Sequence, residues 1–418
     1  MRHLKAFLFV ALSIVCSTAI YAQGDKPVQT IRGVVVDYAS GAPIAHATVS
    51  LLDMPQMGAT TDNEGRFELK HIPVGRHDVQ ASFLGYEPAI FREVLLTSAK
   101  EVYLEIPLRE SVLQLDKVVI RPRVNKEVPV NKMALSGARM LSVEEAGRFA
   151  GGMDDPARLV SSYAGISSSV SSNGISVHGN APSLLQWRLE GVEIPNPNHF
   201  ADVASLGGGV LSSLSKNVLG NSDFYTGAFP AEYNNAVSGI FDMKLRTGNS
   251  QRHQHTLQAG ILGLDVASEG PLSKRWGASY LFNYRYSTTG LMNKVNPAGE
   301  QEQLLDYQDL NFKFNLPTSQ AGTFSLWGTA LIDKVKPKIT PPDKWNYLDD
   351  AKDSRMKQTS AAAGLTHLYT FRGGGALKTT LAATYIQTSA SESIYDMQMK
   401  PSPYLDFRSQ YTHLVLTS

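Results

Sequence analysis

The feature that most constrains this chain is a regular alternation of apolar and polar side chains over residues 253–418. A period of two residues indicates strands whose two faces meet different surroundings. One face of the first long stretch carries Ala278, Tyr280, Phe282, Tyr284 and Tyr286, and the other includes Ser279, Asn283, Arg285 and Ser287. In the next stretch Leu310, Phe312, Phe314 and Leu316 alternate with Asn311, Lys313 and Asn315. The successive aromatic residues indicate a lipid-facing surface, and the polar face would line a wet interior.

The connections between these strands also alternate, in length. Residues 273–276, 318–322 and 372–375 are short connections, whereas residues 288–304, 334–357 and 388–404 are long ones. Short turns on one side and long loops on the other are typical of outer-membrane barrels. We therefore expect about eight strands, the first two of which meet in a tight turn near residues 260–263.

The first 22 residues predict a secretory signal peptide. Arg2 and Lys5 form its basic end, residues 6–20 its apolar core and residues 20–22 a cleavage site. The apolar core is shorter than the roughly 20 residues that a membrane helix needs. Cys16, the only cysteine, lies in this segment, so the exported chain has no disulfide and depends on cores and sheet closure.

The charge balance indicates no nucleic-acid partner. The formal net charge is +1, and loss of Arg2 and Lys5 with the signal peptide makes it −1. After Ala22 no run of 18 apolar residues occurs. This excludes a helical membrane protein but not a barrel of alternating strands.

Residues 28–109 predict a small β-sandwich. Val79, Ala81 and Phe83 alternate with polar neighbours, as one buried and one wet face require. Residues 62–65, DNEG, fit a turn better than a calcium site, because Gly65 supplies the positive φ of a bulged hairpin.

This block resembles the carboxypeptidase regulatory-like domain, a transthyretin-like sandwich. The matching residues include Gly33, Asp37, Ser40, Gly41, Pro43, Ile44, Ala47, Thr61, Asp62, Gly65, Phe67, Ile72, Pro73, Gly75, Gly85 and Tyr86. No His-x-x-Glu occurs in the chain, so the metal chemistry of a zinc carboxypeptidase is not expected.

Residues 175–200, ISVHGNAPSLLQWRLEGVEIPNPNHF, organise the middle of the chain. They contain two apolar-alternating strands, residues 175–177 and 189–194, and then a loop rich in Pro and Asn. Together with residues 227–233, GAFPAEY, and 238–244, SGIFDMK, they resemble the plug domain of TonB-dependent outer-membrane receptors. Three residues depart from that family's usual Arg, Asp and Gly: His178, Glu190 and Asn234.

The resemblance implies an α/β plug over residues 128–249. A capping box at residues 142–145 predicts one short helix, and Asp155 as N-cap predicts another through Val160. Residues 161–174, crowded with Gly and Ser, predict a loop.

Six residues of this region are candidates for a surface exposed towards a small ligand. They are Trp187, Arg188, Asn196, Asn198, His199 and Phe200. The alternative is that Trp187 packs inside the domain and the Asn-Pro repeat is a rigid turn. No nucleophile elbow, metal-ligand spacing or phosphate loop occurs, so we expect neither an enzyme nor a cofactor or metal site.

Residues 110–127 read as a linker between two domains. Part of it resembles the TonB box of Bacteroidota-type receptors, namely Leu115, Asp116, Lys117, Val118, Val119 and Ile120. A short β-prone segment on a flexible chain can add itself to the edge of a partner's sheet. The alternative is a last strand of the sandwich.

The expected fold is therefore mainly β and multi-domain: a sandwich, an α/β plug and transmembrane barrel strands over residues 250–418. A barrel of about eight strands has room only for its own side chains, whereas a plugged lumen needs about 22 strands, the number that the resemblance implies. We expect this chain to hold the first eight or so, since it stops in mid-pattern at residues 414–418.

The resemblance implies import of a small nutrient across a bacterial outer membrane, of the ferric chelate, oligosaccharide or peptide class. TonB, with its inner-membrane energising complex, would capture residues 115–120 and remodel the plug. Outer-membrane lipid and a surface lipoprotein are the further partners that it implies. A non-transporting binding or adhesion protein is the alternative class, and a secreted peptidase rests on the sandwich's family name alone.

Overall fold

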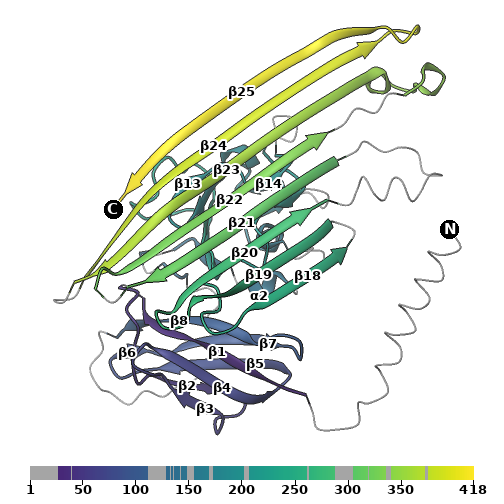
Figure 1. The fold of residues 1–418 in the computed structure, drawn as a ribbon. Helices are drawn as coiled ribbons and strands as arrows, with labels where there is room; N and C mark the ends of the chain where they lie inside the picture. The colour runs from purple at the N-terminus through teal and green to yellow at the C-terminus, as the bar shows by residue number, and fades with distance from the viewer. Residues whose placement is uncertain are drawn as a thin grey trace, which may run out of the picture.

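The computed structural model describes most of the chain after residue 26. The described residues are 27–38, 40–111, 129–131, 133–134, 136–141, 143–147, 155–168, 173–201, 207–260, 263–287, 305–318, 320–335, 340–371 and 375–418. The predicted signal peptide, residues 1–22, and the predicted TonB box, residues 115–120, lie outside them. The described chain is mainly β, with few helices, which confirms the predicted fold class (Figure 1).

Residues 27–111, the sandwich, form two four-stranded sheets (purple and blue in Figure 1). The first has the order β4 (Arg66–Pro73), β1 (Val28–Asp37), β8 (Val102–Glu110), β6 (Tyr86–Glu87). The second has the order β3 (Gly58–Thr60), β2 (Thr48–Leu51), β5 (Gly75–Ser82), β7 (Ala89–Leu96). Alternate apolar residues of both sheets, such as Ile31, Val79 and Ile106, are fully buried in one core.

The predicted turn between β3 and β4 is present. Gly65 has a φ of +72°, and Asp62 Oδ1 accepts the backbone N–H groups of Glu64 and Arg66 at 3.0 and 2.8 Å. The carboxylate therefore acts as a turn-forming acceptor, as the sequence indicated.

Residues 129–249 form the central segment, which is built on a five-stranded sheet. Its order is β13 (Val192–Ile194), β12 (Gln186–Leu189), β17 (Ile240–Met243), β16 (Ser222–Tyr225), β9 (Ala138–Leu141). Two smaller strand pairs are β10 (Ile166–Ser168) with β11 (Ile175–Val177), and β14 (Asn198–His199) with β15 (Leu211–Ser212). The short helices are α2 (Val143–Ala146), α3 (Pro156–Val160) and the 3₁₀ turn η2 (Pro182–Leu184).

Local chemistry explains both the successes and the errors of prediction here. Asp155 Oδ1 accepts the N–H of Ala157 at 2.9 Å, so the predicted cap of α3 is confirmed. Residues 189–194 are not one strand, because Glu190 and Gly191 have φ values of +54° and +88° and form a two-residue hairpin turn between β12 and β13. The predicted loop over residues 161–174 contains β10, which pairs with β11.

Eight antiparallel strands in sequence order make the long sheet (green to yellow in Figure 1). They are β18 (Gln254–Gly260), β19 (Gly263–Ser273), β20 (Ala278–Tyr286), β21 (Leu305–Pro317), β22 (Thr323–Val335), β23 (Lys352–Thr370), β24 (Ala376–Tyr395) and β25 (Pro401–Thr417). The predicted tight turn is present, with Gly260 paired to Gly263. The connections after β19, β21 and β23 are short and lie at the end of the sheet that faces the sandwich (Figure 1).

The long loop predicted over residues 388–404 is wrong. Pairing of β24 with β25 continues to Tyr395 and Pro401, which leaves only residues 396–400 as the connection. The stretch is rich in Ser and lacks an apolar alternation, so its strand character depends on the neighbouring strand. The connection after β22 does stay long and holds η3 (Pro342–Lys344) and η4 (Leu348–Ala351).

The pleat of the long sheet separates an apolar face from a polar one. A row of directly opposed residues crosses β20 to β25 on the outer face: Tyr280, Phe314, Leu326, Leu365, Leu381 and Leu416. Leu326, Leu365 and Leu381 are 41%, 45% and 57% exposed, respectively, whereas Asn283 and Asn311 on the inner face are fully buried. The predicted division of the two faces is thus present, although Ala278 is buried. No helix among the described residues is long and apolar enough to span a bilayer.

We expect truncation of one core side chain to destabilise the sandwich. Ile106→Ala removes a fully buried side chain and should lower the free energy of unfolding of the sandwich by about 2–5 kcal/mol. Leu84→Ala, at an 85% exposed position, should change it by less than about 0.5 kcal/mol. Hydrogen-exchange mass spectrometry of sandwich peptides in the whole protein measures both, and equal effects of the two substitutions would contradict the assigned core.

Candidate functional site at the interface of the central segment and the long sheet

The hairpin turn of β12 and β13 places a carboxylate against the long sheet. Glu190 Oε1 accepts Lys313 Nζ of β21 at 2.9 Å and the N–H of Leu245 at 2.8 Å. Lys378 Nζ of β24 donates to the Glu190 carbonyl at 3.3 Å. Burial acts to raise the pKa of the Glu190 carboxyl, but the ammonium groups of Lys313 and Lys378 outweigh it, so the pKa lies below its ordinary value. The Glu190 carboxyl is therefore held in its charged form.

A histidine of the central segment lies between two aspartates of the sheet. His199 on β14 contacts Asp333 Oδ1 through Nδ1 at 2.5 Å and Asp309 Oδ2 through Nε2 at 2.9 Å. The N–H of Phe200 donates to the other oxygen of Asp333 at 2.8 Å, and Arg285 Nε donates to Asp309 at 2.7 Å. Two carboxylate acceptors need both ring nitrogens to be donors, which is the imidazolium form.

The environment of His199 favours its charged form. Burial acts to lower the pKa of the imidazole, but the hydrogen bonds and charges of Asp309 and Asp333 outweigh it and raise the pKa above its ordinary value of 6.5. The formal charges of this cluster balance, because two carboxylates face one imidazolium and the Arg285 guanidinium. The Tyr307 ring lies beside the imidazole, with centroids 4.6 Å apart. The result is a buried bridge between β14 and strands β21 and β22.

A third ionic contact joins the C-terminal end of the central segment to the first hairpin of the sheet. Arg246 binds Glu269 of β19 in bidentate fashion, at 2.6 and 2.9 Å. The N–H of Asn249 donates to the same carboxylate at 3.0 Å. Two parallel hydrogen bonds between the planar guanidinium and carboxylate groups fix the orientation of the two side chains as well as their distance.

An apolar contact lies among these charges. Trp327 of β22 is fully buried in the core of the central segment, together with Leu281, Ala362 and Ala382 of the sheet. Its indole lies over Gly364, where a Cβ atom would come within 2.5 Å of the ring. A small residue on β23 is therefore required for the indole to enter the interface.

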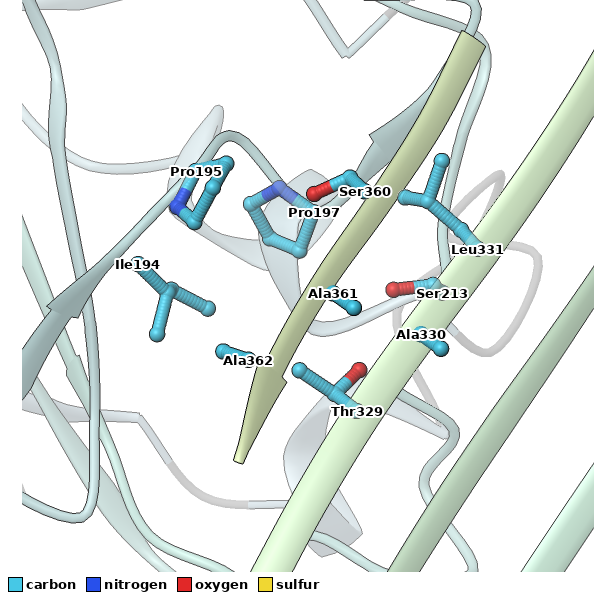
Figure 2. A pocket seen from close by; sticks show the side chains of 10 residues that line it. All are labelled: Ile194, Pro195, Pro197, Ser213, Thr329, Ala330, Leu331, Ser360, Ala361 and Ala362. Carbon is cyan, nitrogen blue, oxygen red and sulfur yellow. The ribbon is translucent and has the colours of Figure 1, made fainter. Parts of the chain in front are cut away.

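Between the central segment and strands β22 and β23 lies a narrow crevice (Figure 2). Ile194, Pro195 and Pro197 face Thr329 to Leu331 and Ser360 to Ala362 across it. Its cavity volume of about 10 Å³ is far below the roughly 300–1,000 Å³ of ligand pockets. The crevice is thus a gap in the packing of the interface and not a binding site for a nutrient.

The six predicted ligand-contacting residues do not form an exposed surface. Trp187, Asn198, His199 and Phe200 are each at most 8% exposed, so their expected exposure is wrong. Trp187 stacks on Phe241 with centroids 4.2 Å apart, which is the core packing weighed as the alternative. A direct role of these residues in ligand contact stays a prediction.

The two remaining candidates and the Asn-Pro loop hold local structure. Asn196 Oδ1 accepts the N–H of Asn198 at 3.0 Å, and its Nδ2 donates to the Gly207 carbonyl at 2.6 Å, as in a rigid turn. Arg188 is half-buried, donates to the Gly191 carbonyl at 2.6 Å and lies 4.9 Å over the Tyr233 ring.

The acidic partners on the sheet were not among the residues predicted from the sequence. Asp309 is in phase with the predicted inward residues Asn311 and Lys313, so the same period-two pattern would have placed it inside. A second missed feature is the directly opposed pair Asp223 and Asp242 on β16 and β17. Burial raises the pKa of Asp223 to about 6, even though two backbone N–H groups donate to it.

No group of three or more His, Cys, Asp or Glu side chains among the described residues is arranged to hold a metal ion. The described interface is made of ion pairs, hydrogen bonds and apolar contacts between protein groups. These contacts attach the central segment to the long sheet.

Residues 30–109 match the family model of the carboxypeptidase regulatory-like domain, as the sequence indicated. No curated protein matches the chain. Among solved structures, the ferric enterobactin receptor PfeA of Pseudomonas aeruginosa is 12% identical over 66% of this chain and 45% of its own, with a TM-score of 0.42.

Two other solved structures match to a similar extent. The siderophore receptor PirA of Acinetobacter baumannii is 13% identical over 67% of this chain and 44% of its own, with a TM-score of 0.42. The outer membrane transporter YddB of Escherichia coli is 12% identical over 66% and 53%, with a TM-score of 0.37. This chain thus spans about half the length of the solved structures that it resembles.

Breaking the Glu190–Lys313 pair should loosen the central segment. Glu190→Gln leaves the Lys313 ammonium buried without its counter-ion and should cost about 3–5 kcal/mol of stability. Lys313→Met alone should cost a similar amount, and the double substitution should recover much of the loss. Urea unfolding in detergent micelles gives the coupling energy, and strictly additive single effects would contradict a buried pair.

The His199 bridge should make stability depend on pH. Since its pKa is raised in the folded state, the bridge contributes fully below the ordinary value of 6.5 and is lost as pH rises through the raised pKa. The urea midpoint should therefore fall between pH 6 and pH 9 in the native protein. In His199→Gln the fall should be smaller, and an unchanged slope would contradict the bridge.

Proposed function

We propose that this chain acts as a TonB-dependent transporter of the bacterial outer membrane, with the central segment as its plug. One observation carries the proposal: a folded segment is seated through buried ion pairs on the polar face of a sheet whose other face is an exposed apolar row. An exposed apolar surface of that extent suits lipid, and the ionic inner face suits a removable occupant.

The dimensions of the strands support a membrane setting. Strands β23, β24 and β25 contain 19, 20 and 17 residues, whereas about 9–11 tilted residues cross a bilayer. The long strands therefore extend well beyond the apolar layer. They do so at the end opposite the sandwich, so that end is assigned to the outside and the sandwich to the periplasm (Figure 1).

The source of energy follows from the location. An outer membrane has no nucleotide supply, so work on the plug must come through a partner that spans the periplasm. Residues 115–120 are the segment that we assign to TonB, by strand addition to its sheet. A small nutrient of the ferric chelate, oligosaccharide or peptide class is the proposed cargo.

A non-transporting adhesion protein is the alternative function. It would need neither a partner-binding linker nor a central segment that can leave the sheet. Heat-modifiable migration in detergent gels would support the membrane barrel, and its absence would favour the alternative.

The linker tests the proposal directly. Deletion of residues 115–120 should abolish growth on the nutrient that a null strain fails to use, while the variant still reaches the outer membrane. Deletion of residues 122–127 shortens the linker equally and should preserve growth. Normal growth of the first variant would overturn the proposed function.

A further inference from the structure

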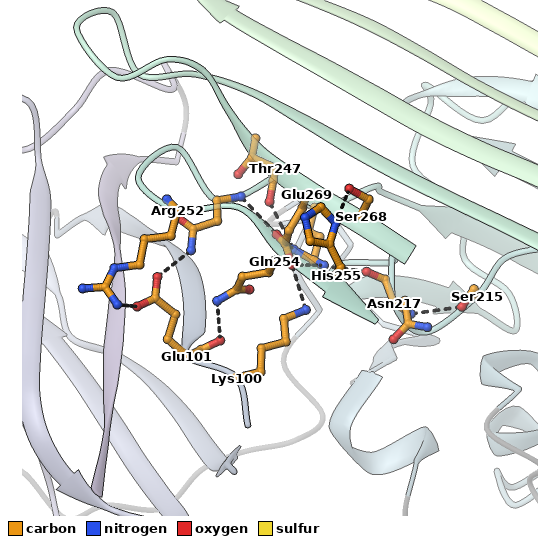
Figure 3. Close-up of polar contacts among 12 residues, drawn as sticks. Lys100, Glu101, Ser215, Asn217, Thr247, Arg252, Gln254, His255, Ser268 and Glu269 are labelled. Atoms are coloured by element: carbon orange, nitrogen blue, oxygen red, sulfur yellow. Dashed lines mark hydrogen bonds and ion pairs between the residues drawn. The ribbon is translucent and has the colours of Figure 1, made fainter. Parts of the chain in front are cut away.

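The sandwich docks on the short-turn end of the long sheet through buried charge (Figure 3). Glu101, only 5% exposed, accepts Asn249 Nδ2 at 2.8 Å with Oε1 and Gln254 Nε2 at 3.2 Å with its carbonyl. Its Oε2 lies 3.6 Å from Arg252 and accepts Arg32 Nε of the sandwich at 3.1 Å. A carboxylate buried this deeply is costly without such partners, so the contact is a built one.

A second carboxylate connects all three parts of the chain. Glu269 of the sheet, held by Arg246 of the central segment, also accepts Lys100 of the sandwich at 2.8 Å. Beside it, Thr247 Oγ1 donates to Glu105 Oε2 at 2.6 Å. Undocking the sandwich would therefore leave Glu269, the carboxylate that holds Arg246, without one of its two cationic partners.

Docking extends across the sheet to β23. Thr370 Oγ1 donates to the Ser40 carbonyl at 2.9 Å. The Leu368 side chain lies so close to Gly41 that a Cβ atom there would come within 2.5 Å of it, and Gly41 has a φ of +67°. The sandwich thus contacts the sheet at two places that are five strands apart in the sheet order from β18 to β23.

The sandwich also holds the start of the central segment. Arg109, near the end of β8, donates to the Pro129 carbonyl at 3.1 Å and to the Val130 carbonyl. The N–H groups of Val130 and Asn131 donate in turn to Asp223 at 2.6 and 2.7 Å. Arg109 therefore joins the two described segments that flank residues 112–128.

We propose that the sandwich is a brace that keeps the central segment seated, and that it must leave the sheet before the central segment can move. A pull on residues 112–128 would act on both flanking segments, because Arg109 joins them. The load on the central segment is then shared by the contacts of Lys100, Glu101 and Ser40 with the sheet and the central segment. The mechanical part of this inference rests on the proposed function, whereas the docking itself does not.

Covalent bridging tests the brace in the whole protein. Residues 23–418 contain no cysteine, so Ser40→Cys with Thr370→Cys introduces one reactive pair into this part of the protein. A short bis-methanethiosulfonate should join the two in membrane-embedded protein and lower nutrient-dependent growth at least ten-fold, and a reductant should restore it. Each single substitution is the matched control, and Glu105→Cys with Thr247→Cys is a second pair at a more exposed contact.

Two results would overturn the brace. One is failure of both pairs to form a bridge in the membrane, and the other is growth of the bridged protein at the rate of its controls. If bridging has no effect while deletion of residues 115–120 abolishes growth, the brace fails and the proposed function stands.

Hydrogen exchange tests the contact of Arg109 without a nutrient. Arg109→Gln should speed exchange in residues 129–141 by about ten-fold, as loss of a charge-assisted hydrogen bond implies. Arg76→Gln, on an exposed arginine that bonds the carbonyl of Glu93 within the sandwich, should leave that peptide unchanged. Equal exchange in both variants would show that the sandwich does not hold the segment.

Discussion

Charges that face inward from the long sheet must be matched by whatever lies behind it. Lys313, Asp309 and Asp333 are each at most 8% exposed, and burying an ion without a partner costs several kcal/mol. The central segment supplies the partners, Glu190 and His199. The inner face of the sheet therefore accepts this segment in one position and penalises any other.

Pairing of this kind fixes position without making attachment permanent. A buried ion pair contributes little net stability compared with apolar packing of the same volume, although removing one partner alone is expensive. The apolar contacts of the interface gather around Trp327 and in a second cluster of Phe200, Leu211, Tyr307 and Met356. Such a surface suits the removable plug that we propose, whereas the sandwich has an apolar core between its two sheets.

The position of the sandwich, docked against the sheet and the central segment, is the basis of the bracing role that we propose for it. Glu269 receives Lys100 from the sandwich and Arg246 from the central segment, so the three parts share one buried carboxylate. Arg109 adds a hold on the first described residues of the central segment. Seating of the central segment and docking of the sandwich are thus energetically linked through a few polar groups at one end of the sheet.

Prediction from the sequence succeeded for features that depend on neighbours along the chain. Period two set the faces of the long strands, Asp155 capped α3, and residues 62–65 made a turn, because these effects act over a few residues. Only the tertiary structure decided the partners: His199 lies between aspartates 110 and 134 residues away, and Trp187 is buried because Phe241 stacks on it. Such pairs depend on which strands the fold brings together, and no local pattern encodes that distance.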